Sequence, residues 1–136
     1  MNTYNLFISH SWTYGSQYDN LVTHLNERGY FNWKNYSVPK NDPIHQANND
    51  RELYEAIKRQ IAPSSVILIL AGVYSSYSKW IDKEIKIAKS EFWTPKPIIA
   101  IEPFGSERTS AFVKQNADRI VKMQTERIIE AIRALG

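Results

Sequence analysis

The run SVILILA at residues 65–71 contains no charged residue, glycine or proline. Successive side chains of a strand point to opposite faces, so a strand built from this run is apolar on both faces. Such strands are typical of the centre of a parallel sheet that helices cover on both sides. The run therefore predicts an α/β fold with these residues in the middle of its sheet.

Strand-like and helix-like segments alternate along the rest of the chain. Further strands are expected at residues 3–9, 31–33, 96–101 and 119–123. Apolar residues at helical spacing predict helices over residues 16–28, 50–62, 79–92, 109–116 and 125–135, with Asp50 and Thr125 as caps. This alternation indicates a single domain over residues 1–136 with a flavodoxin-like, doubly wound sheet of five parallel strands in the order 2-1-3-4-5.

Polar and aromatic segments follow the first three predicted strands. They are HSWTYG at residues 10–15, the stretch at residues 34–49, and GVYSSYSKW at residues 72–80. The second has no periodicity and is expected to be a long loop, and loops of that length are usually functional or disordered. Ligands of open parallel sheets bind beyond the carboxyl ends of the strands, where the strand order reverses. A site is therefore expected between the first and third strands.

Several kinds of chemistry are excluded by what the sequence lacks. It has no cysteine, so disulfides, a thiol nucleophile and thiolate metal sites are absent. Its three histidines lack metal-ligand spacing, so no metal site is expected. No glycine-rich phosphate motif occurs, so a bound nucleotide would be held by backbone amides and by serine and asparagine side chains.

Charge and hydropathy give no sign of a nucleic-acid or membrane partner. The net charge is +3, and the densest basic stripe, formed by Lys79, Lys83 and Lys86, is typical of a solvated helix face. The longest apolar run is too short to cross a bilayer, and the first residues do not resemble a signal peptide. We expect a cytoplasmic protein.

Ser9, His10 and Ser11 raise the alternative of a hydrolase nucleophile. Neighbouring side chains of a strand diverge, so Ser9 and His10 would point to opposite faces. No G-x-S-x-G turn surrounds either serine. A pocket role for His10 is the better interpretation.

Trp80 and Glu84 lie four residues apart, so they are neighbours on a helix that begins at the expected site. An indole offers a stacking surface, and a carboxylate accepts hydrogen bonds from ribose and stabilises a cationic, oxocarbenium-like transition state. In the competing interpretation, Trp80 packs against a loop and Glu84 bonds to a lysine. The spacing alone favours this second, structural interpretation.

Two stretches of the sequence resemble a TIR domain. They are YNLFISHSW at residues 4–12 and SSVILILAGVYSSYSKWIDKEI at residues 64–85. TIR domains carry a serine after the third strand and then S-x-W-x-x-x-E, which matches Ser75, Ser78, Trp80 and Glu84 here. With KNYSVP at residues 34–39, the pattern is most similar to bacterial TIR-like proteins, including those of anti-phage defence systems such as Thoeris.

The resemblance implies an enzyme that cleaves the nicotinamide–ribose bond of NAD, with Glu84 as the catalytic residue. NAD would be a substrate, and no cofactor or metal is implied. The product would be an ADP-ribose-type signal, cyclic in Thoeris-like systems, that activates a separate effector. Trp80 would lie against the substrate. The other substrate-binding residues would be Phe7, Ser9, His10, Ser11, Asn41, Asp42 and Ser75.

Two alternatives to an enzyme are distinguishable. The resemblance also implies self-association through TIR–TIR contacts, so a non-catalytic adaptor module is one alternative, although an adaptor does not need both Trp80 and Glu84. A flavodoxin-like receiver or nuclease-related domain is the other, but a receiver requires clustered acids at the end of the first strand, and residues 5–11 contain none.

Overall fold

The computed structural model describes residues 3–9, 15–37, 50–70, 79–102 and 111–136, with the side chains of residues 15–17, 50, 79 and 80 left out. Within these ranges, parallel strands form one sheet in the order β2-β1-β3-β4-β5. The strands are β1 (Thr3–Ser9), β2 (Asn32–Asn35), β3 (Val66–Leu70), β4 (Ile98–Glu102) and β5 (Arg119–Lys122). The predicted α/β class and strand order are confirmed.

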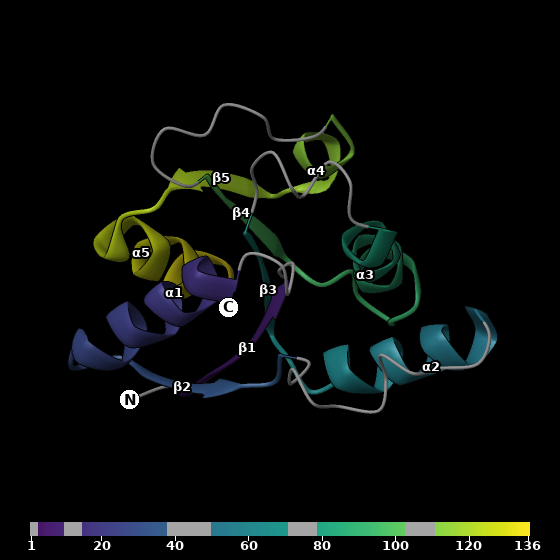
Figure 1. Ribbon diagram of the computed structural model, residues 1–136, viewed down its shortest axis with the longest axis horizontal. Helices are drawn as coiled ribbons and strands as arrows, with labels where there is room; N and C mark the ends of the chain where they lie inside the picture. The colour runs from purple at the N-terminus through teal and green to yellow at the C-terminus, as the bar shows by residue number, and fades with distance from the viewer. Residues whose placement is uncertain (1–2, 10–14, 38–49, 71–78, 103–110) are drawn as a thin grey trace.

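Helices cover both faces of the sheet, as Figure 1 shows. Helices α1 and α5 lie on one side, and α2, α3 and α4 lie on the other. Their bounds are α1 (Gly15–Glu27), α2 (Asp50–Ile61), α3 (Lys79–Ser90), α4 (Ala111–Asn116) and α5 (Thr125–Leu135). In the ranges that the structure describes, every helix is too short or too polar to cross a membrane.

The alternation of side chains along β1 divides the core into two. Leu6 and Ile8 pack in the cluster beneath α1 and α5. Phe7 packs in the other cluster, with apolar residues of α2, α3 and α4. Since Ser9 lies two residues beyond Phe7, it continues the face covered by α2 and α3. Strand β3 is wholly buried between the two clusters, as the run without charges predicts.

Two local predictions are wrong. Strand β2 extends to Asn35, although a loop was expected from Lys34: these two residues pair with Asn5 and Leu6 of β1. Polar side chains are tolerated there because β2 is an edge strand and both residues are exposed to solvent. At the last helix, the N-cap is Gln124 rather than Thr125, and it makes no side-chain capping bond.

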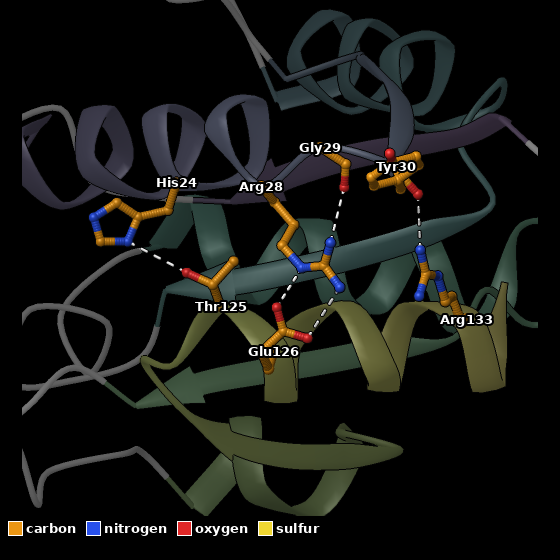
Figure 2. A network of polar contacts seen from close by, with 7 residues as sticks. All are labelled: His24, Arg28, Gly29, Tyr30, Thr125, Glu126 and Arg133. Atoms are coloured by element: carbon orange, nitrogen blue, oxygen red, sulfur yellow. Dashed lines mark hydrogen bonds and ion pairs between the residues drawn. The ribbon is translucent and has the colours of Figure 1, made fainter.

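A polar network joins α1 to α5 on the side of the sheet away from α2 and α3 (Figure 2). The guanidinium of Arg28 donates to both carboxylate oxygens of Glu126 and, at 2.9 Å, to the carbonyl of Gly29. Arg133 of α5 donates to the carbonyl of Tyr30 at 2.9 Å. Gly29 and Tyr30 both have positive φ, 74° and 54°, so the chain turns sharply from α1 toward β2.

Candidate active site

Helix α3 places Glu84 inside the sheet-facing stripe of the helix. Ile81, Ile85 and Ala88 of this stripe are fully buried, and Glu84, three residues after Ile81, is only 5% exposed. The sequence predicts Glu84 beside this stripe, whereas the structure places it among the apolar residues. A carboxyl group at such a position is costly unless it is neutral or partnered.

Ser9 lies at the carboxyl end of β1, where the strand order reverses between β1 and β3. It pairs in register with Ile69 of β3 and is 1% exposed. Sheets of this topology bind ligands at that point. Ser9 thus follows Phe7 at the buried end of a β1 face whose other members are Thr3 and Asn5.

The side chains of Ser9 and Glu84 are close to each other. The Ser9 hydroxyl acts on the pKa of the Glu84 carboxyl as a hydrogen-bond donor. However, Ser9 Oγ and Glu84 Oε2 each lack a hydrogen bond of regular geometry among the described residues.

Burial raises the pKa of Glu84 from 4.5 to about 8, and the Ser9 hydroxyl opposes this rise. The carboxyl group is therefore mostly protonated at neutral pH. Within the described ranges, no lysine forms an ion pair with Glu84. A buried carboxyl with a strongly raised pKa is typical of an acid–base or charge-stabilising site.

A second serine, which the sequence analysis left in a loop, supports this site. The backbone amide of Ile8 donates to Ser37 Oγ at 2.9 Å. Gln60 of α2 donates to the carbonyls of Tyr36 and Ser37 at 2.9 and 3.3 Å. Ser37 thus continues the β1–β2 ladder through its side chain and fixes β1 one residue before Ser9. A serine at the end of an edge strand is the only sequence signal for this role, and it is weak.

The structure describes only some of the remaining predicted site residues. Phe7 is fully buried in the core cluster, next to Ser9 along the same face. Trp80 lies in the first turn of α3, and its side chain is outside the described atoms. The other predicted residues lie outside the described ranges: His10, Ser11, Asn41, Asp42 and Ser75. Across the described ranges, no group of three or more His, Asp or Glu side chains is arranged to hold a metal ion.

Comparison with known families gives one match. The family model described as "Thoeris protein ThsB, TIR-like domain" matches residues 7–108, about three-quarters of the chain. The matched region runs from β1 through β4 and includes both Ser9 and Glu84. No curated protein matches the chain.

Proposed function

Because the chain belongs to the family of the TIR-like domain of the Thoeris protein ThsB, we propose that it is an enzyme that cleaves NAD. The products are nicotinamide and an ADP-ribose-type molecule, which is cyclic if the ribose is captured within the same nucleotide. In this proposal the nucleotide product is a signal in anti-phage defence that a separate effector binds.

Glu84 carries the chemistry in this proposal. The bond between ribose C1′ and the nicotinamide nitrogen breaks, and its electron pair leaves with the nitrogen of neutral nicotinamide. The ribose becomes cation-like, and an ionised Glu84 stabilises this charge. Water captures the cation and releases one proton to give a linear product, whereas a lone pair of an atom in the same ADP-ribose forms the new bond to C1′ to give a ring. The positive charge of the bound nicotinamide ring itself favours ionisation of Glu84.

The burial of the Glu84 carboxyl in an apolar stripe is the observation that carries this proposal. Buried ionisable groups without an ion-pair partner destabilise a fold, and no ion pair to Glu84 is present among the residues that the structure describes. The neighbouring hydroxyl of Ser9, at the switch point of the sheet, provides a polar contact of the kind that a sugar hydroxyl also makes. Trp80, at the start of the same helix, is proposed to stack on the nicotinamide side of the substrate.

The direct test is incubation of the purified chain with NAD and measurement of released nicotinamide by chromatography and mass spectrometry. Glu84→Gln should abolish release while the circular dichroism spectrum stays unchanged. Asp82→Asn, which removes a half-exposed carboxylate from the same helix, is the matched control and should retain activity. Full activity in Glu84→Gln would overturn the proposed role.

Self-association is part of the proposed function. If a neighbouring copy completes the site, activity rises more steeply than linearly with protein concentration. The adaptor alternative predicts assembly without nicotinamide release at any concentration. Sedimentation and the NAD assay on the same samples separate the two, and a fully active dilute monomer would contradict the assembly requirement.

A further inference from the structure

We propose that Gln60 of α2 is a positioning residue of the candidate active site, which acts through Ser37 on the carboxyl end of β1. This inference rests on the proposed function, because it assigns Gln60 a part in the same reaction. Gln60 does not contact the substrate in this proposal. Its side-chain amide holds the segment that follows β2, and this segment holds Ile8, the residue before Ser9.

The carboxyl end of β1 is held differently on its two sides. Toward β3, the strand register continues to Ser9, the last residue of β1. Toward β2, the register of the described residues ends at Leu6. Beyond that point, the backbone amide of Ile8 donates to a side chain, Ser37 Oγ, at 2.9 Å. The position of Ser37 therefore affects where the last residues of β1 lie.

Ser37 is 6% exposed, and its three polar groups have three different partners. Its hydroxyl accepts from the amide of Ile8, and its own amide donates to Asn35 Oδ1 at 2.9 Å. Its carbonyl accepts from Gln60 Nε2 at 3.3 Å. Asn35 in turn donates to the hydroxyl of Tyr18 on α1 at 2.6 Å. Ser37 is thus held between helices from both layers of the fold.

Gln60 is the contact that joins Ser37 to α2. Its Nε2 donates to the carbonyl of Tyr36 at 2.9 Å as well as to that of Ser37. A primary amide has two N–H donors, so one side chain can serve two adjacent carbonyls. Gln60 lies between Ile57 and Ile61, which are fully buried in the core. The donor is therefore presented by a helix that is itself fixed by packing.

This contact links the two sides of the candidate active site. Helix α2 packs in the same core cluster as Ile81 and Ile85 of α3, the helix that carries Glu84. A shift of the end of β1 relative to this layer changes where Ser9 lies relative to Glu84. A displacement of about 1 Å at a reacting centre can lower a rate by about 100-fold. The contacts of Gln60 therefore bear on catalysis as well as on stability.

The test is the kinetics of nicotinamide release in Gln60→Glu, at neutral pH and at a temperature where every variant is folded. The change keeps the size of the side chain and replaces its donors with oxygens that repel the two carbonyls. We expect kcat/KM to fall by about tenfold or more. Gln60→Lys restores a donor and should recover most of the activity, because Lys96 already donates to two carbonyls in this protein, at 2.9 and 2.7 Å.

Asn116→Asp is the matched control, because it makes the same change from amide to carboxylate in α4. Asn116 Nδ2 donates to the carbonyl of Phe112 at 2.8 Å, and α4 packs against α3 and β4. This variant should retain kcat and KM. Unchanged kcat and KM in Gln60→Glu would overturn the inference, even if that variant is less stable in urea. An equal loss in Gln60→Lys would also overturn it, because the donor would then not be what matters.

A second readout does not depend on activity. Amide hydrogen exchange followed by NMR compares the amide of Ile8 with that of Leu68, which lies in the fully buried strand β3. In Gln60→Glu, the amide of Ile8 should exchange about tenfold faster relative to Leu68, the equivalent of one weakened hydrogen bond. Equal changes at both amides would indicate a role in global stability alone and would overturn the inference. Absence of nicotinamide release from the unmodified protein overturns the proposed function instead, and the exchange rates still decide whether Gln60 holds the end of β1.

Discussion

Replacing Glu84 with glutamine should stabilise the fold while abolishing the proposed activity. The folded protein holds the carboxyl proton up to a pKa of about 8, whereas the ordinary value is 4.5. Between these values the unfolded chain has released a proton that the folded chain retains. The contribution of the Glu84 carboxyl to the free energy of unfolding is therefore fully present below pH 4.5 and is lost as the pH rises to about 8. Glutamine does not titrate, so the variant escapes this loss.

The size of the effect follows from the width of this pH window. One pKa unit corresponds to about 1.4 kcal/mol. Integrated from pH 5 to pH 8, the free energy of unfolding of the unmodified protein should fall by about 3 kcal/mol relative to Glu84→Gln. The difference should reach a plateau above pH 8, where both states of the unmodified protein are ionised. Effects of this size are a large fraction of the stability of a small domain.

Urea unfolding at a series of pH values, followed by circular dichroism, measures this difference. Asp82→Asn is the control for the loss of one negative charge from α3, and its free energy of unfolding should track that of the unmodified protein much more closely. The reasoning fails if the difference between Glu84→Gln and the unmodified protein is constant over the range. It also fails if the variant becomes the less stable of the two at high pH, because the carboxyl would then be ionised and partnered in the folded state.

Three further changes test other parts of the structure. Ser37→Ala leaves the buried amide of Ile8 without an acceptor and should lower the free energy of unfolding by about 1–3 kcal/mol in urea. Burial raises the pKa of Asp118, but hydrogen bonds from Lys89 and a backbone amide lower it below 3.8. The contribution of this carboxylate to the free energy of unfolding is therefore present above that pH and is lost in acid. Asp118→Asn should destabilise the protein at pH 6 and much less at pH 2. Gly29→Ala should lower the free energy of unfolding by about 1 kcal/mol in the same assay, because Gly29 has φ of +74°, which side chains rarely adopt. The added carbon meets nothing within 4 Å, so the loss comes from the backbone conformation alone, and Gly29→Asn should lower the free energy of unfolding by less.

The fold was predictable because the hydrophobic pattern determines it. The uncharged run that forms β3 admits only a buried central strand, and alternating helices then require a parallel sheet. Element ends were less predictable. Strand β2 contains Lys34 and Asn35, whose own preferences oppose a strand, and its pairing with β1 on one side overrides them.

The candidate site was predictable only in part. Spacing on a helix puts Glu84 one turn after Trp80 in α3, and Ser9 lies at the carboxyl end of β1. Local spacing does not reveal that Glu84 faces inward, because this depends on how α3 packs against the sheet. Nor does it reveal Ser37, whose hydroxyl acts across 29 residues of sequence on the amide of Ile8. The family resemblance, and not periodicity, singled out Glu84 as catalytic.

The division of β1 between two cores has a consequence for its evolution. Odd-numbered positions, Phe7 and Ser9, serve the layer that holds Glu84, and even-numbered positions, Leu6 and Ile8, serve the opposite layer. Inserting or deleting one residue in this strand would exchange the two sets, placing a hydroxyl under α1 and α5 and a large aliphatic side chain against the carboxyl. We therefore expect this strand to diverge by point substitutions, whereas selection should remove insertions and deletions of a single residue.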